Sequence, residues 1–134
     1  MADEPDQPEE TMEDVIGADG RYPLEAYAFL HEGLARAVKH VHGAEVSLGA
    51  QQHVSGQELC REMRDLAIER WGALARTVLA KWNVRKTIDF GNMVYLLIEH
   101  GFMRKTQEDS LEDFRDVFDF EEAFGSSNDF ELKE

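Results

Sequence analysis

The sequence predicts a mainly α-helical fold with a small β-hairpin near the C-terminus, in which a winged-helix-like helix-turn-helix second half packs on an N-terminal helix. Three observations support this prediction. Apolar residues recur at helical spacing in four segments, glycines follow three of these segments, and aromatic residues alternate between positions 113 and 120. An all-α bundle is the alternative fold.

Length and charge predict the domain organisation. The 134 residues, of which 43% are hydrophobic, suit one domain with one packed core. Residues 1–20 hold eight Asp/Glu and no Lys/Arg, and residues 106–134 hold eleven Asp/Glu and two Lys/Arg. Since the whole chain has a net charge of −14, residues 21–105 carry a net charge of +3. We predict a flexible acidic arm over 1–20, a single helical domain over 21–124 and a frayed acidic tail over 125–134.

The first two helices are predicted over 23–42 and 56–71. Pro23 suits a first helical turn, and Gly43 suits the left-handed residue that ends a helix. Ser55 and Glu58 have the spacing of a capping box at the start of the second helix. Each segment carries one apolar face, as expected of helices that share a core.

The next two helices are predicted over 73–82 and 87–100, separated by a short turn. Thr87 is a candidate N-cap, Asp89 lies in the first turn, and Gly101 follows the last residue. The segments 74–82 and 88–100 form the predicted helix-turn-helix pair.

The hairpin is predicted from strands over 102–106 and 113–120 joined by a polar loop. Phe114, Phe118 and Phe120 share one face at the two-residue period of a strand. Leu111, Phe114 and Phe118 also match helical spacing, so periodicity leaves strand and helix open for this segment.

Four strings of the sequence are similar to a family of small uncharacterised proteins from planctomycetes and verrucomicrobia. They are YPLEAYAFLHEG at 22–33, HVSGQELC at 53–60, TIDFGNMVYLLIEHGFMRK at 87–105 and DSLEDFRDVFDFEEAF at 109–124. The family has no established activity. The resemblance therefore implies one compact unit in a bacterial, cytoplasmic setting and assigns no catalytic residue.

The candidate catalytic groups lack the partners that their chemistry needs. The single cysteine, Cys60, excludes an internal disulfide and lies on an apolar helical stripe, where a small buried residue is expected. The five histidines match no zinc-ligand spacing. The N-terminal residues lack the pattern of a signal peptide, and no 18-residue apolar run is present. We expect a cytoplasmic protein that is not an enzyme and has no catalytic residue, cofactor, metal site or membrane segment.

Two functions remain, and each has candidate residues. The first is a non-enzymatic protein-interaction module, for a partner and an oligomeric state that the sequence does not identify, with an aromatic surface made of Phe114, Phe118, Phe120 and Phe124. Packing of these rings over the first predicted helix, 23–42, is the competing interpretation. The second is a nucleic-acid-binding winged-helix regulator with autoinhibitory acidic ends, whose candidate contacts are Arg85, Lys86, Asn92, Arg104 and Lys105.

Overall fold

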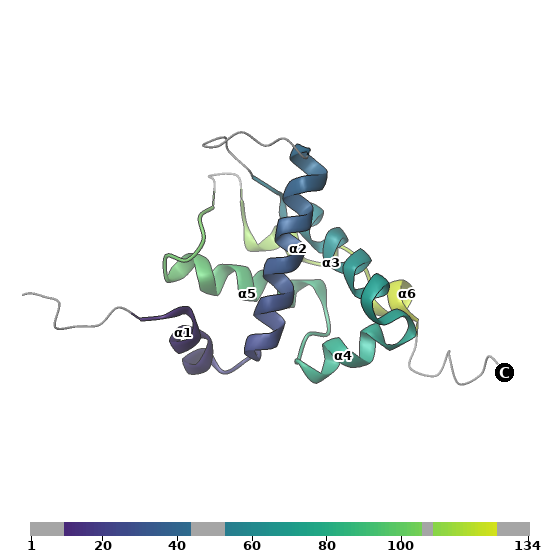
Figure 1. Cartoon of the computed structure of the whole chain (residues 1–134), viewed down its shortest axis with the longest axis horizontal. Coiled ribbons are helices and arrows are strands. Elements are labelled where there is room, and N and C mark those ends of the chain that lie inside the picture. Colours follow the sequence, from purple (N-terminus) through teal and green to yellow (C-terminus); the bar gives the residue numbers. More distant parts are fainter. Residues whose placement is uncertain (1–9, 44–52, 106–108, 126–134) are drawn as a thin grey trace, which may run out of the picture.

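The computed structural model of the chain describes residues 10–43, 53–105 and 109–125, and it is mainly helical (Figure 1). The elements in order are α1 (Met12–Asp19), α2 (Leu24–His42), α3 (Gly56–Trp71), η1 (Gly72–Leu74), α4 (Ala75–Lys81), α5 (Thr87–Glu99), η2 (Leu111–Phe114) and α6 (Phe120–Phe124), where η denotes a 3-10 helix. The mainly-α prediction is confirmed, and the predicted helices lie within a few residues of α2 to α5.

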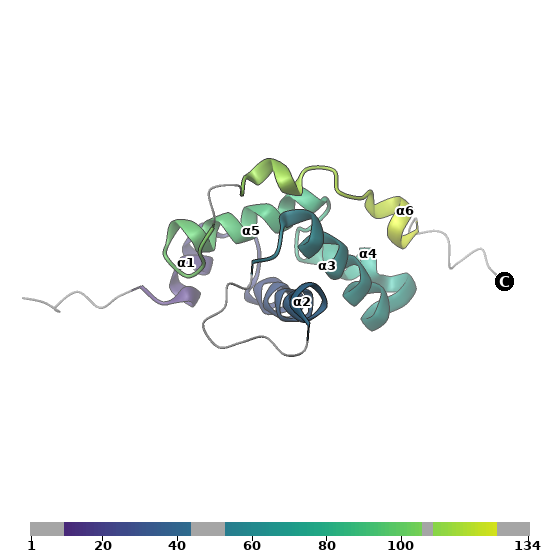
Figure 2. The ribbon, with the colours of Figure 1, turned by 90° about the horizontal axis from the view of Figure 1, so that it is seen from above.

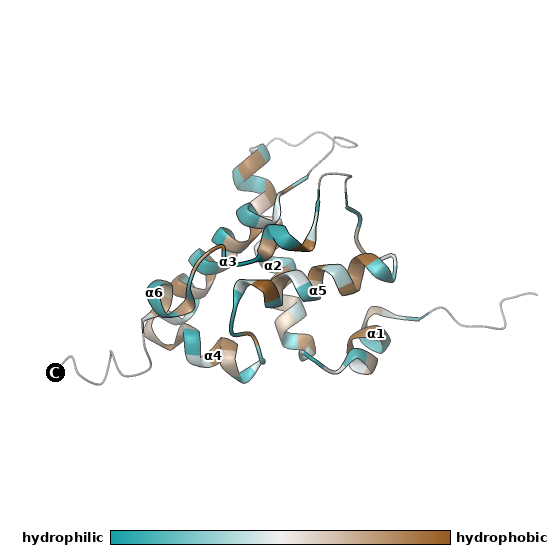
Figure 3. Ribbon diagram, turned by 180° about the vertical axis from the view of Figure 1, so that it is seen from behind, coloured by the Kyte–Doolittle hydropathy of each residue, from teal (hydrophilic) through white to brown (hydrophobic). Residues whose placement is uncertain are grey.

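The elements form three layers. Figure 2 shows α2 on one side, α3 and α5 in the middle, and the segment from η2 to α6 running across the opposite side. The contacts agree, because α2 packs on α3 while η2 packs on both α5 and α3. Helices α2 to α5 each carry apolar and polar residues (Figure 3), as helices with one buried face do.

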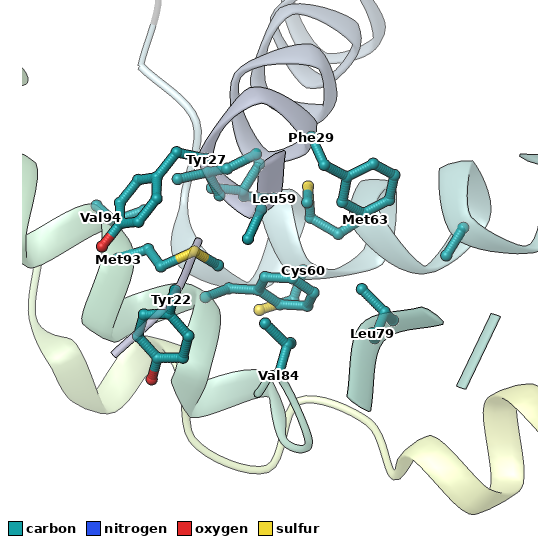
Figure 4. Close-up of a cluster of buried hydrophobic side chains, with 14 of the residues drawn as sticks. Tyr22, Tyr27, Phe29, Leu59, Cys60, Met63, Leu79, Val84, Met93 and Val94 are labelled. Atoms are coloured by element: carbon teal, nitrogen blue, oxygen red, sulfur yellow. The ribbon is translucent and has the colours of Figure 1, made fainter. Parts of the chain in front are cut away.

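The core lies where α2, α3, α4 and α5 meet. Tyr27 of α2, Cys60 of α3, Leu79 of α4 and Met93 of α5 are almost completely buried there (Figure 4). Burial of large apolar side chains from four separate helices makes these helices one cooperative unit.

Local sequence signals determine where α3 begins. The Ser55 hydroxyl accepts a hydrogen bond from the Glu58 amide at 3.0 Å, and the Glu58 carboxylate accepts one from the Ser55 amide at 2.9 Å. The predicted capping box is therefore confirmed, because both side chains pair with amides that the first helical turn leaves without partners.

Helices α2 and α3 approach each other closely. A Cβ atom added at Gly33 of α2 would lie 2.1 Å from the Met63 sulfur of α3. Buried Glu62 of α3 pairs with two side chains of α2, with Arg36 Nε at 3.2 Å and with His40 Nδ1 at 2.7 Å. The Oε1 atom shares a hydrogen bond with His40, whereas Oε2 lies beside the Arg36 guanidinium without a hydrogen bond to the described residues, so the buried carboxylate is only partly satisfied.

The predicted hairpin is wrong. Within the described ranges no residue is in a strand, and residue 106 and the start of the predicted loop lie outside them. Residues 113–120 contain the end of η2, an irregular stretch and the first residue of α6. The backbone carbonyl of Phe114 and the amide of Val117 bond to the Thr87 side chain, so they have no need of a strand partner.

The winged-helix prediction is not supported either, because α5 lies inside the fold. Seven residues of α5 are buried, and within this helix Glu99 is the exposed residue. A recognition helix needs an exposed face that can enter a DNA groove. Helix α5 instead contacts α3 and η2.

The structure also differs from the predicted flexible arm. Residues 12–19 form α1, which Thr11 caps by accepting a hydrogen bond from the Asp14 amide at 3.0 Å. Val15 and Ile16 are buried. The acidic composition of 1–20 conceals this pair of adjacent apolar residues, and their burial contributes to the packing of α1 on α2. Residues 1–9 of the arm and 126–134 of the predicted tail lie outside the described residues.

Candidate functional site

Phe114 anchors the C-terminal segment between two helices. A Cβ atom added at Gly56 of α3 would lie 2.9 Å from the Phe114 ring, and one added at Gly91 of α5 would lie 2.8 Å from its Cβ atom. Glycine at both positions leaves the space that the ring occupies. Phe114 is 5% exposed and belongs to the core.

Thr87 anchors the same segment by hydrogen bonds. Its buried hydroxyl donates to the Phe114 carbonyl at 2.6 Å and accepts from the Val117 amide at 3.1 Å. Thr87 is the first residue of α5 and not its cap, which corrects the prediction. The two hydrogen bonds fix the position at which the chain leaves η2. The chain then turns toward α6 at Asp116, whose φ is 52°.

Three aromatic rings form a cluster after this turn. The centroids of Phe118 and Phe120 lie 5.4 Å apart in a stacked arrangement, and Phe124 lies 5.1 Å from Phe120 and 5.8 Å from Phe118. Phe120 and Phe124 are buried, whereas Phe118 is partly exposed. The guanidinium carbon of Arg64 lies 5.9 Å from the centre of the Phe118 ring.

The predicted aromatic surface is therefore mostly core. Phe114, Phe120 and Phe124 pack inside the domain and offer no surface to a partner. These three rings are packed within the domain, as the competing interpretation expected, but the main contacts of η2 and α6 are with α3, α4 and α5 and not with the first predicted helix. Among the four predicted residues, Phe118 is accessible.

Phe118 lies in a groove that we call the strap groove, with a volume of about 740 Å³. Its basic side comes from α4 and the turn before α5, and its acidic side comes from the C-terminal segment. The charged lining residues are Arg76, Arg85, Lys86, Asp116, Asp119, Glu121 and Glu122. The groove thus brings together parts of both predicted sites, Phe118 and Phe120 from one and Arg85 and Lys86 from the other.

The charges of the strap groove nearly cancel. Three basic and four acidic side chains line it. Arg85 and Lys86 are exposed to solvent, as are the four carboxylate residues. Interactions with these groups are therefore weakened by salt and act more on the rate and selectivity of binding than on affinity.

Asn92 has an internal role. Its side-chain amide donates to the Tyr22 hydroxyl at 3.0 Å, and that hydroxyl donates to Asp89 Oδ1 at 2.7 Å. The other Asp89 oxygen accepts from the amides of Arg85 at 2.7 Å and Lys86 at 3.0 Å. Burial is the main cause that raises the pKa of Tyr22 to about 12, and the phenol therefore stays protonated, as this network requires. Asn92 is engaged within the protein and is not placed to read a base.

The four predicted cations are divided between the two ends of α5. Arg85 and Lys86 precede its first residue, and Arg104 and Lys105 follow its last turn. A helix of 13 residues is about 20 Å long. The structure does not bring these four side chains into one patch.

Cys60 is not placed for nucleophilic chemistry. Burial raises the pKa of its thiol to about 12, and the side chain is completely inaccessible. Within the parts of the chain that the structure describes, no three His, Cys, Asp or Glu side chains are grouped so that they could hold a metal ion.

Two features of the site were not predicted from the sequence: the packing of Phe114 against Gly56 and Gly91, and the hydrogen bonds of Thr87 to the C-terminal segment. Gly91 interrupts an otherwise strong helical pattern, and a glycine inside a helix often marks the close approach of another segment. That signal identifies the position but not the residue that approaches it. Thr87 gives no comparable signal, because its partners are 27 and 30 residues away.

None of the family models, curated proteins or solved structures compared with the chain matches it significantly. The resemblance to the planctomycete and verrucomicrobial family therefore stays a prediction. Among the described residues, no helix has the length and apolar character needed to span a membrane.

Proposed function

We propose that the protein is a non-enzymatic interaction module that binds a short segment of a partner protein in the strap groove. The observation that carries the proposal is the partly exposed ring of Phe118, which lies among basic and acidic side chains in a groove of about 740 Å³. The bacterial and cytoplasmic setting is part of the proposal and rests on the resemblance in sequence.

The packing beneath Phe118 makes it suitable as a binding anchor. Its ring stacks on Phe120, and Phe124 supports both rings. Since Phe120 and Phe124 are buried, Phe118 has little freedom to lose when a partner covers it. Aromatic side chains held in this way often carry much of the binding free energy of an interface.

The charges of the groove identify the kind of segment that it would bind. An apolar residue of the partner packs on Phe118, an acidic residue faces Arg85 and Lys86, and a basic residue faces the carboxylates of 116–122. A nucleic acid fits less well, because a phosphate backbone that reached the three basic side chains would also meet four carboxylates.

Affinity capture from cells that naturally make the protein tests the proposal. The tagged baits are the wild type, Phe118→Ala, and Val41→Ala as a matched control. Val41 is a 41% exposed apolar residue near the end of α2, outside the groove. We expect the wild type and Val41→Ala to recover the same partner, and Phe118→Ala to bind a peptide of that partner about tenfold more weakly or worse.

Two further outcomes are decisive. Equal peptide affinity of the wild type and Phe118→Ala, with unchanged thermal unfolding, would contradict the groove as the binding site. Recovery that is lost after nuclease treatment, and lost also in the double variant Arg85→Glu/Lys86→Glu, would replace the proposal by the nucleic-acid-binding alternative.

A further inference from the structure

A second hollow lies at the other end of α5, away from the strap groove. Its volume is about 210 Å³, and it is formed by α2, the start of α3, the second half of α5, residues that follow α5, and η2. Its apolar wall includes the side chains of Leu34, Val54, Leu59, Val94, Tyr95 and Ile98. Since an apolar cavity of about 150 Å³ holds benzene, the second hollow has room for a side chain of the size of leucine.

One cation without a partner lines the second hollow. Among the described residues, Arg104 makes no ion pair and no hydrogen bond. The chain before it is held in place, because the amides of Phe102 and Met103 donate to the Leu97 carbonyl at 2.8 and 3.3 Å. Arg104 is also exposed, so a ligand can reach it from solvent. A guanidinium in this position favours a ligand that carries a carboxylate.

Two carboxylates line the same hollow. Asp109 is engaged within the protein, since its Oδ1 atom lies 3.1 Å from His53 Nε2. Asp113 accepts from the Ser110 amide through Oδ2 at 3.1 Å, and its Oδ1 atom makes no hydrogen bond to the described residues. A Cβ atom added at Gly56 would lie 2.9 Å from Asp113 Cβ, so Asp113 packs against the start of α3. Its remaining oxygen favours a ligand that carries a protonated amine.

The two charges beside one apolar wall determine which ligand fits. A ligand with only a carboxylate would pair with Arg104 but would be repelled by Asp109 and Asp113, and a ligand with only an ammonium group would be repelled by Arg104. A zwitterion pairs with both charges, and an apolar side chain on it fills the hollow.

We propose that the second hollow binds a free α-amino acid with an apolar side chain of about the size of leucine. Its carboxylate pairs with Arg104, its ammonium group pairs with Asp113, and its side chain packs between α3 and α5. This site is independent of the strap groove, so the failure of one proposal leaves the other standing.

Four compounds that differ in one feature each test the inference. Leucine carries both charges, N-acetylleucine lacks the ammonium group, leucinamide lacks the carboxylate, and alanine lacks most of the apolar side chain. Each is titrated into the full chain at about pH 7, where free amino groups are mostly protonated, and binding is followed by NMR shifts of the methyl groups of Leu34, Val94 and Ile98.

We expect leucine to bind about threefold to tenfold more tightly than N-acetylleucine or leucinamide, because each of these lacks one ion pair in a partly exposed site. Alanine should bind more than about tenfold more weakly than leucine, since it buries much less apolar surface.

Two variants separate the roles of the charges. Arg104→Gln should weaken the binding of leucine about threefold to tenfold and should not weaken that of leucinamide. Asp113→Asn keeps an oxygen that accepts from the Ser110 amide, and it should weaken the binding of leucine but not that of N-acetylleucine. Lys105→Gln and Glu112→Gln are the matched controls, because both residues are exposed and lie outside the lining of the hollow, and they should leave the binding of leucine unchanged.

The inference is overturned if leucine does not bind, or if N-acetylleucine, leucinamide or alanine binds as tightly as leucine. It is overturned equally if Arg104→Gln and Asp113→Asn, with folded amide spectra, bind leucine as the wild type does.

Discussion

A single hydroxyl group, that of Thr87, holds the segment that completes the domain. It pairs with the carbonyl of Phe114 and the amide of Val117, and both pairs lie in a buried or partly buried setting. Backbone polar groups in such a setting need partners, and here no strand or helix supplies them. The course of the chain from η2 to Phe118 therefore depends on this side chain as well as on the packing of Phe114.

Replacement of Thr87 by valine should destabilise the domain by about 2 kcal/mol, because it leaves a carbonyl and an amide without partners while it keeps the shape of the side chain. The free energy of unfolding in urea measures this. Thr77→Val is the matched control, since Thr77 lies exposed in α4, and its effect should stay within about 0.5 kcal/mol. Equal effects of the two substitutions would show that the Thr87 hydrogen bonds contribute no stability.

At the scale of elements, the segment from η2 to α6 determines where the candidate sites lie. It places Phe114 against Gly56 and Gly91, supplies Phe118 and four carboxylates to the strap groove, and closes one side of the second hollow, which Tyr95 and Ile98 line. Its position depends on how closely η2 approaches α5. This approach requires that Gly91 has no side chain.

Gly91→Ala should therefore destabilise the protein although alanine favours helix. The new Cβ atom would lie 2.8 Å from Phe114 Cβ and Cγ. The resulting overpacking, about 1–3 kcal/mol, exceeds the gain in helix propensity of about 1 kcal/mol. Thermal and urea unfolding should show a net loss of up to about 2 kcal/mol.

Gly17→Ala is the control for this substitution. Gly17 lies in α1, and a Cβ atom there would meet nothing within 4 Å. Alanine should raise stability at this position by about 0.5–1 kcal/mol. If Gly91→Ala also raised stability, η2 would not pack against α5 as the structure has it.

At the scale of the whole molecule, α5 is the central helix of the domain and separates two hollows. The strap groove lies at its first residues, and the hollow that Tyr95 and Ile98 line lies along its second half. The residues between them are largely buried, and they join both sites to one core.

This core makes stability fall at alkaline pH. Burial raises the pKa of Tyr22 and of Tyr27 from 10.0 to about 12, and that of Cys60 from 9.0 to about 12. The folded state holds these protons more tightly than the unfolded state does, so their stabilisation is complete below the unfolded pKa values and is lost as pH rises through the folded ones. The urea midpoint should thus fall steadily from about pH 9 toward pH 12.

Tyr27→Phe is the informative variant for this pH dependence. The Tyr27 hydroxyl oxygen is buried and has no hydrogen bond to the described residues, so its removal should not weaken the fold at neutral pH. The alkaline fall in the urea midpoint should become shallower in this variant. Tyr22→Phe should in contrast lose stability at neutral pH, because Asp89 and Asn92 lose their partner. An unchanged midpoint of the wild type up to pH 11 would contradict the prediction.

Much of the helical fold could be predicted from the sequence. Ser55 and Glu58 marked the start of α3, and Gly43, Gly72 and Gly101 marked helix ends where the structure has positive φ angles. These signals act over a few residues, and the same local contacts form in the helix itself. The candidate sites were predicted less completely. Four phenylalanines were expected at the surface, but Phe114, Phe120 and Phe124 are buried and Phe118 alone of the four is partly exposed.

The sequence by itself thus determined helices α2 to α5, their approximate limits and the division of charge along the chain, because capping, periodicity and composition are local properties. The tertiary structure decided that α5 is central, that the segment at 113–120 follows Thr87 and not a strand, and that Arg85 shares a groove with Phe118. These features depend on contacts between residues about 30 positions apart, such as Thr87 with Val117. Phenylalanines at 114, 118 and 120 match a strand and in part a helix, and the segment forms neither throughout. Phe114 packs in the space that Gly56 and Gly91 leave, and the Thr87 hydroxyl bonds to the chain on both sides of the turn that follows.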